Sequence, residues 1–192
     1  MHTRLFVLLL ILPVAAVQAS GPLGDAIRKE VIVNASVSEV WKAWTTSEGA
    51  STWLAERTHI RGELGGPFEV YFLPEAPYGG QGCEGCRIHA LDPMKRLAFT
   101  WTAPPQFPSI RLPGLMTIVD IQLQSVSADR TRVAFTQYGW GVGGQWADVR
   151  RYFESAWDTP LGRLKHRFGV GPIDWKRPPV ITESFSVAAT IQ

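Results

Sequence analysis

The sequence contains few of the residues and motifs that identify metal sites and hydrolases. Only four histidines occur among 192 residues, and none belongs to the H-E-x-x-H pattern of zinc proteases. The G-x-S-x-G turn of α/β-hydrolases is also absent. The chain therefore carries no local motif for these two reaction classes, and we expect no metal site. A Ser-His-Asp arrangement assembled in space leaves no such motif, so it stays open.

Charged residues are also scarce. They make up 19% of the chain with a formal net charge of +2, whereas 45% of the residues are hydrophobic. This composition is too apolar for a disordered chain and too weakly basic to indicate a nucleic-acid partner. No internal repeat is present, and the length predicts a single domain with at most a tail.

A long apolar run occurs at the N-terminus, where 13 residues from Leu5 to Val17 follow the positive charge of Arg4. Ala19 then supplies the small residue that signal peptidase requires. A membrane span needs about 20 apolar residues, so the run is short for an uncleaved anchor, which is the alternative. Residues 1–19 therefore predict a secretory signal peptide and an exported protein, periplasmic or secreted, with no integral membrane span after processing.

The two cysteines, Cys83 and Cys86, form a C-x-x-C pair in a glycine-rich turn before a predicted strand. An oxidising compartment favours a local disulfide between them. Two unlinked thiols are the second interpretation. Redox or zinc chemistry is the least favoured, because a redox pair needs a helix N-terminus and a zinc site needs a second pair of ligands.

Short β-rich segments joined by short connections predict an antiparallel sheet. The first strand is expected at residues 27–34. Ser36 and Glu39 form a capping box, which predicts a helix ending near residue 46, and a short helix is expected at residues 48–54. Alternating apolar residues or β-rich composition predict further strands at residues 58–64, 68–72, 86–91, 97–102, 119–123 and 133–136.

A long helix is predicted over residues 145–168, where apolar side chains recur at three- and four-residue spacing. Pro160 lies inside this pattern and should kink the helix about one turn earlier. Two loops rich in proline and glycine, 74–82 and 103–114, are expected at sheet ends, where a ligand enters. Residues 180–192 alternate only weakly, and we favour a mobile tail over an edge strand.

Two further patterns have a structural explanation. Residues 139–144 satisfy G-x-G-x-x-G, but a dinucleotide site also needs a parallel strand after the helix, and the chain nearly ends there. We interpret them as a strand-to-helix turn and expect no cofactor. Dipole complementation and solvation explain the basic residues in the last helical turns, with an anionic-lipid surface as the alternative. These residues are Arg163, Lys165, His166 and Arg167.

The chain contains, in order, the strings VNASVSEVWKAWTTSEGASTWL, LGGPFEVYF, EGCRIHALDPMKRLAFTW, TRVAFTQYGWG and YFESAWDTPLGRLKHRFGVGPIDW. They resemble the heat-shock-protein-90 ATPase activator homologue family of the SRPBCC superfamily, which includes START and Bet v 1-like domains. The resemblance implies an α+β helix-grip fold, with a curved antiparallel sheet, two short N-terminal helices and a long C-terminal helix over a cavity. The expected organisation is a signal peptide at 1–19, an SRPBCC/START-like domain at 20–175 and a C-terminal tail at 176–192.

The resemblance also bears on function. Superfamily members bind or transport hydrophobic ligands, and some are cyclases or hydrolases. No catalytic residue is carried over to this chain. A chaperone partner is not expected, because export separates the protein from an ATP-dependent cytosolic chaperone.

Aromatic residues make up 11% of the chain, and the order of elements places several of them between the sheet and the long helix. Imperfect packing there leaves an apolar cavity, the usual form of a small-molecule site. We therefore predict a non-enzymatic exported protein that binds a small hydrophobic or amphipathic ligand. The predicted ligand-binding residues are Phe72, Phe99, Trp101, Trp140, Phe153 and Trp157.

Two alternatives remain. An enzyme of the cyclase or hydrolase kind requires a polar pair that points into the cavity, although we interpret the acidic residues of the sheet region, Glu84 among them, as solvated. The candidates for that pair are Tyr71, Glu84, His89 and Tyr138. A protein-interaction module acting on an envelope partner would instead have a filled core and an exposed apolar patch.

Overall fold

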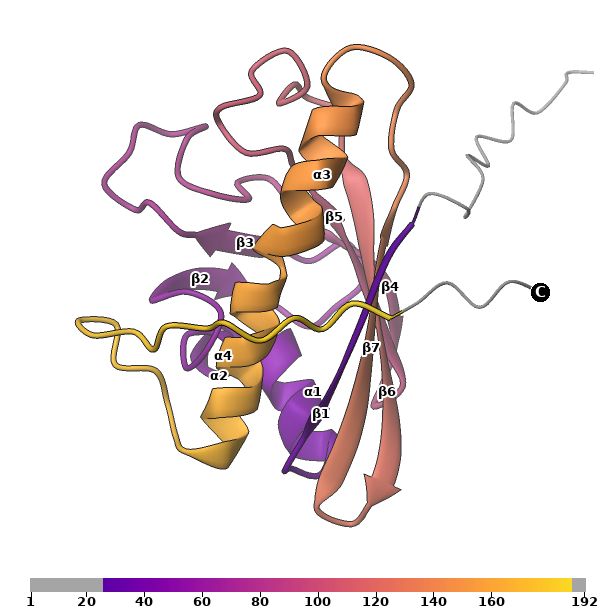
Figure 1. The fold of residues 1–192 in the computed structure, drawn as a ribbon, viewed down its shortest axis with the longest axis vertical. Coiled ribbons are helices and arrows are strands. Elements are labelled where there is room, and N and C mark those ends of the chain that lie inside the picture. Colours follow the sequence, from indigo (N-terminus) through magenta and orange to yellow (C-terminus); the bar gives the residue numbers. More distant parts are fainter. Residues whose placement is uncertain (1–25, 188–192) are drawn as a thin grey trace, which may run out of the picture.

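The computed structural model describes residues 26–187, which form an α+β fold (Figure 1). A twisted antiparallel sheet lies on one side of a helix pair, and a smaller two-stranded ribbon lies on the other. The predicted signal peptide lies outside the described residues. Among the residues described, each helix is too short or too polar to traverse a lipid bilayer.

Five strands form the main sheet in the order β1-β7-β6-β5-β4, and every neighbouring pair is antiparallel, as predicted. Apolar side chains alternate along β1 and β7, so one face of the sheet is buried against the helices. The strands are β1 (Ile27–Val33), β4 (Ile88–Asp92), β5 (Arg96–Trp101), β6 (Thr117–Ser127) and β7 (Arg130–Tyr138).

The remaining strands, β2 (Arg57–Ile60) and β3 (Phe68–Tyr71), pair only with each other. They are shorter than the sequence predicts, and β4 begins at residue 88 instead of 86. β4 begins late because the segment before it is glycine-rich and the φ angle of Gly85 is +74°. A residue in that conformation cannot continue a regular strand, so the ladder between the two sheets reduces to isolated bridges.

Two short helices follow β1, as predicted. In α1 (Val37–Thr45) the capping box is present: the Ser36 N–H donates to the Glu39 carboxylate at 2.9 Å, and the Ser36 hydroxyl accepts from the Glu39 N–H. The second helix, α2 (Ser47–Ala50), is a single turn.

The long C-terminal helix is broken in two. Its parts are α3 (Trp146–Ala156) and α4 (Asp158–Gly169), with Trp157 at the junction. Pro160 has no N–H, so the carbonyl of Ala156 has no helical partner and the helix breaks one turn before the proline. The kink predicted from the sequence is therefore confirmed. The broken helix crosses the inward face of the sheet (Figure 1).

Aromatic rings fill the space between the helices, the ribbon and the sheet. Phe68 of β3 stacks on Phe99 of β5, with 3.6 Å between the ring centroids. Trp44 of α1 contacts both Trp53 and Phe99. These rings are almost fully buried, so they anchor the two-stranded ribbon to the main sheet.

The C-terminal segment differs from the mobile tail that we expected. Its chain runs across α4 and reaches the edge of the sheet at β1 (Figure 1). The Glu30 N–H donates to the Phe185 carbonyl at 2.9 Å, and Ser186 forms a β-bridge with Lys29. Because Phe185 is also buried, hydrophobic and backbone contacts hold this segment in place up to residue 187. The rest of the predicted tail, residues 188–192, lies outside the described residues.

Candidate ligand-binding pocket

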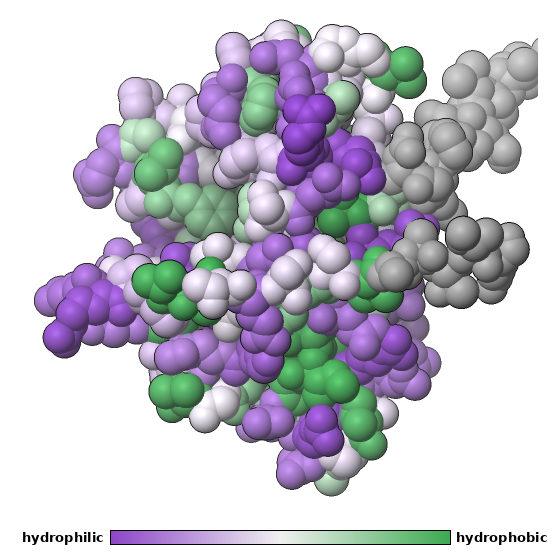
Figure 2. All heavy atoms as spheres, viewed as in Figure 1, coloured by the Kyte–Doolittle hydropathy of each residue, from purple (hydrophilic) through white to green (hydrophobic). Residues whose placement is uncertain are grey.

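A pocket of about 530 Å³ lies where the helix breaks, between the α3/α4 junction and two loops. Its volume is within the usual range for small-molecule sites. In the face drawn in Figure 2, apolar surface lines a recess beside the helix. Both loops that the sequence predicted near a ligand entrance contribute to it: Gly80, Gln81 and Gly82 from one, and residues 103–106 from the other.

Four of the six predicted ligand-binding residues line this pocket. They are Phe72, Trp101, Phe153 and Trp157. Trp101 and Trp157 meet at its base with 4.8 Å between their ring centroids, and both are buried. Phe72 lies at the rim, where 42% of its surface is exposed. The pocket therefore has an aromatic base that joins β5 to the broken helix.

Phe99 and Trp140 do not line the pocket. Phe99 lies two residues before Trp101 on the same face of β5, which places it beneath β3 and against Phe68. Trp140 follows Gly139, whose positive φ angle turns the chain away at the end of β7. Each nevertheless touches a lining ring, since Phe99 contacts Trp101 and Trp140 contacts Phe153. Phe99 and Trp140 therefore pack against residues of the pocket wall without lining the pocket themselves.

The sequence prediction missed several lining residues. The loop residues were predicted only as a region. Six lining residues of the broken helix were not predicted: Tyr152, Ser155, Ala156, Thr159, Pro160 and Arg163. Arg163 was interpreted as part of a solvated basic cluster. In a regular helix a spacing of six residues turns Arg163 about 120° away from Trp157, so the sequence pattern does not indicate that both side chains line one pocket.

A buried chain of hydrogen bonds fixes the base of the pocket. The Trp157 indole N–H donates to the Gln137 side-chain carbonyl at 2.8 Å. The Gln137 amide donates to the Thr117 hydroxyl at 2.9 Å, which donates to the Trp101 backbone carbonyl at 3.0 Å. Because all these groups are buried and partnered, the chain orients Trp157 relative to β5, β6 and β7.

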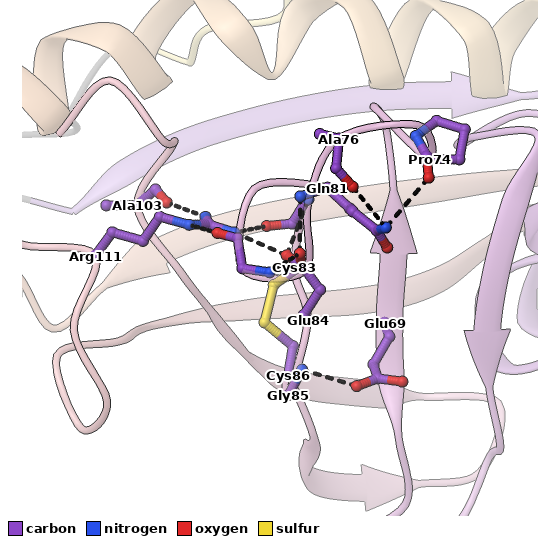
Figure 3. A network of polar contacts seen from close by, with 12 residues as sticks. Glu69, Pro74, Ala76, Gln81, Cys83, Glu84, Gly85, Cys86, Ala103 and Arg111 are labelled. Atoms are coloured by element: carbon purple, nitrogen blue, oxygen red, sulfur yellow. Dashed lines mark hydrogen bonds and ion pairs between the residues drawn. A yellow bond between two sulfur atoms is a disulfide. The ribbon is translucent and has the colours of Figure 1, made fainter. Parts of the chain in front are cut away.

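The wall opposite the helix is held by a buried ion pair between Glu84 and Arg111 (Figure 3). The carboxylate of Glu84 accepts from the N–H groups of Gly79, Gln81 and Gly82, as well as from Arg111 at 2.7 Å. Arg111 also donates to carbonyls in both loops. The pair therefore ties the two pocket loops together, and we call it the loop clamp.

The loop clamp lies beside the cysteines. Cys83 and Cys86 are joined by a disulfide that encloses Glu84 in its short loop (Figure 3). A closed loop this small has little effect on the entropy of the unfolded chain, so we expect the bond to act mainly on local geometry. Our interpretation of Glu84 as a solvated carboxylate was wrong, because only 3% of its side chain is exposed.

Burial and hydrogen bonding have opposite effects on the pKa of Glu84. Desolvation alone would raise the pKa of the carboxyl, but the hydrogen bonds donated by backbone N–H groups outweigh it and hold the pKa below its ordinary value of 4.5. A lowered folded-state pKa means that the ionised clamp stabilises the protein above the unfolded-state pKa. That contribution is lost as the pH falls through the folded-state pKa.

Replacing Glu84 with glutamine should loosen the loops without unfolding the domain. An amide must present its NH₂ to a backbone N–H or to Arg111, so at least one donor loses its acceptor. We expect amide hydrogen exchange in residues 79–82 to accelerate about tenfold to a hundredfold, in line with the strength of charge-assisted hydrogen bonds. Wild-type protein should show the same loosening on acidification below pH 4.5.

Glu75 provides the matched control for this experiment. It lies in the same loop but is exposed, so Glu75→Gln removes the same charge without removing the clamp. Equal acceleration in both variants, measured by hydrogen-exchange mass spectrometry at neutral pH, would contradict the assignment of the clamp to Glu84.

The polar candidates for an enzyme lie outside the pocket. Tyr71 donates to Glu69 at 2.9 Å, and burial together with this acidic partner raises the pKa of Tyr71 to about 12. Glu84 is occupied by the loop clamp, and His89 is exposed on β4. Tyr138 alternates with inward-facing Gln137, so it lies on the opposite face of the sheet. The structure therefore brings no two of these four candidates into the pocket.

Comparisons with known proteins agree with this fold. One family model, described as activator of Hsp90 ATPase homolog 1-like protein, matches residues 34–169. The chain belongs to this family. Membership places it in the SRPBCC superfamily and confirms the resemblance seen in the sequence. The matched range includes every residue that lines the pocket, from Phe72 to Arg163.

Solved structures share the fold at low sequence identity. Protein MLL2253 of Mesorhizobium loti has a TM-score of 0.57 and 19% identity, with 73% of this chain and 94% of that one covered. The Aha1 dimer from Colwellia psychrerythraea has a TM-score of 0.55 and 21% identity, with 76% and 97% covered.

A third structure is DynU16, described as a protein of the dynemicin biosynthetic locus. Its TM-score is 0.55 at 22% identity, with 77% of this chain and 48% of that one covered, so this chain spans about half its length. A search of curated proteins gives no match. These likenesses confirm the helix-grip fold expected from the sequence.

Proposed function

We propose that this protein is an exported binding protein for a small hydrophobic or amphipathic molecule. The observation that carries the proposal is the pocket of about 530 Å³ with buried Trp101 and Trp157 at its base. Two features of the surrounding structure favour a binding site over a packing defect. The hydrogen-bond chain orients the base, and the loop clamp orders the wall, so the pocket is pre-formed.

The family and the fold support the coarser part of this proposal, because membership of the SRPBCC superfamily suggests a ligand-binding domain. Export rests on residues 1–19, and the Cys83–Cys86 disulfide is consistent with an oxidising compartment. A catalytic role finds less support, since the polar candidates lie elsewhere. An interaction module predicts a filled core, which the pocket argues against.

Native mass spectrometry tests both parts of the proposal in one measurement. Protein isolated from the envelope or medium of its own host should have the mass of a chain that begins at Ser20, with a small apolar molecule retained on a fraction of the molecules. A product that starts at Met1 and stays inside the cell would contradict export. Repeated isolation without any adduct, together with no binding of a neutral apolar dye such as N-phenyl-1-naphthylamine, would contradict the binding role.

A pocket-filling variant assigns the bound molecule to this site. Ala156 lines the pocket at the end of α3, so Ala156→Trp should expel the adduct and weaken dye binding at least about tenfold. Ala147 lies on the same helix but is exposed and outside the pocket. Ala147→Trp should therefore leave the adduct and the dye affinity unchanged.

A further inference from the structure

Among the described residues that line the pocket, Arg163 is the one with a formally charged side chain. It projects from α4, six residues beyond Trp157. No aspartate or glutamate lines the pocket, so among residues 26–187 nothing there neutralises its charge. The pocket thus has an apolar wall and a single positive charge.

The guanidinium of Arg163 has no hydrogen-bond or ion-pair partner within the described part of the chain. Its Nε is fully buried and makes no hydrogen bond. The acidic residues on nearby segments are already engaged: Asp158 with Lys29, Glu183 with Lys165, and Asp174 with Arg177. A buried donor without an acceptor is rare in folded proteins, so it calls for an explanation.

Arg163 is nevertheless held in place. Its guanidinium lies over the ring of Trp175 at 5.2 Å from the centroid. That ring is fixed in turn, because its indole N–H donates to the Ser51 carbonyl at 2.7 Å. Burial lowers the pKa of Arg163, which reflects the cost of holding a charge there without an anion. A stacked, oriented and unpaired guanidinium is pre-organised to receive one.

We propose that the ligand is an amphipathic monoanion with a carboxylate head, and that Arg163 binds the carboxylate while the aromatic base holds the apolar part. This inference rests on the proposed function and adds the class of ligand. The planar guanidinium matches the two oxygens of a carboxylate. A single positive charge balances one negative charge, whereas a phosphate monoester carries nearly two at neutral pH.

Displacement of N-phenyl-1-naphthylamine by matched amphiphiles tests the inference. Decanoate and decanol have the same chain length and differ in the charged head, and decyl phosphate tests the second anionic head. Wild-type protein should prefer decanoate over decanol by about tenfold or more, and decanoate over decyl phosphate. The preference for decanoate should weaken as the salt concentration rises.

Variants at Arg163 separate its charge from its bulk. Arg163→Met keeps a long apolar stem and should abolish the preference for decanoate over decanol. Its melting temperature should equal or exceed that of the wild type, because a half-buried guanidinium without a counter-charge is removed. Arg163→Lys should retain part of the preference. Arg167→Met, one turn further along α4 and outside the pocket, removes the same charge and should retain the full preference.

The outcomes distinguish this inference from the proposed function. Binding of decanol without a preference for decanoate in the wild type would overturn the inference alone. So would a preference that survives in Arg163→Met. If neither the dye nor any amphiphile binds, the proposed function fails and the inference fails with it. The wild-type comparison decides the question even where a variant does not fold.

Discussion

Trp157→Ala is expected to lower the free energy of unfolding by about 3–5 kcal/mol and to change apolar-dye affinity at least tenfold. Only 2% of Trp157 is exposed, and its ring lies 4.6 Å from Phe135 and 4.8 Å from Trp101, centroid to centroid. The substitution removes these contacts and leaves the Gln137 carbonyl without its donor. A loss of this size is compatible with a folded domain of typical stability.

The conservative variant separates the hydrogen bond from the ring. Trp157→Phe keeps an aromatic wall but removes the indole N–H, so we expect a loss of about 1–3 kcal/mol from the unpaired Gln137. Dye affinity should then stay near that of the wild type, since the pocket surface is largely preserved. Urea denaturation and dye titration on the same samples measure the two quantities.

Trp53 provides the control for general destabilisation. It is fully buried, its indole N–H donates to the Ala43 carbonyl at 3.0 Å, and it lies outside the pocket. Trp53→Ala should therefore cost about as much stability as Trp157→Ala, again about 3–5 kcal/mol, while the folded fraction binds dye normally. Equal changes of dye affinity in Trp53→Ala and Trp157→Ala would contradict the assignment of Trp157 to the ligand site.

The fold was largely predictable because it depends on local patterns. The Ser36–Glu39 box, the alternation along the strands and the proline inside the helix each act within a few residues, and the structure follows all three. The separate β2–β3 ribbon was not predicted. It results from Gly85 and its neighbours, and a positive φ angle is not determined by composition alone.

The candidate pocket was less predictable, because long-range contacts decide it. Phe99 and Trp101 share a face of β5, and only the packing of β3 over Phe99 determines which one reaches the pocket. Glu84 is buried because it pairs with Arg111, which lies 27 residues later in the chain. The C-terminal segment has weak propensity for a strand. Its position depends on Asp158, which accepts from the Phe185 N–H and also pairs with Lys29, 129 residues earlier in the sequence. Sequence patterns contain no information on such pairings.

Asp158→Ala is expected to lower the free energy of unfolding by about 3–5 kcal/mol. The side chain of Lys29 is completely buried in β1, and its Nζ donates to Asp158 at 2.6 Å and to the Ser186 hydroxyl at 3.1 Å. The same Asp158 oxygen accepts from the Phe185 N–H at 3.0 Å. Removing the carboxylate leaves a buried ammonium without a counter-charge and releases the C-terminal segment from α4.

The exposed pair Arg151–Asp148 supplies the control. Asp148 also lies in the first turn of a helix, but 55% of its side chain is exposed, so Asp148→Ala should cost no more than about 1 kcal/mol. Both substitutions remove one carboxylate from the first turn of a helix. The difference between their losses of stability therefore measures the effect of burying the ion pair.

The double variant Lys29→Met/Asp158→Ala should recover most of the lost stability. Most of the expected cost lies in the unpaired charge, and methionine replaces lysine with an apolar side chain of similar length. A double-mutant cycle measured by urea denaturation should therefore give a coupling energy of about 2–3 kcal/mol between Lys29 and Asp158. If the double variant were instead as unstable as Asp158→Ala, the backbone contact with Phe185 would be the interaction that matters, and the buried ion pair would contribute little to the stability of the fold.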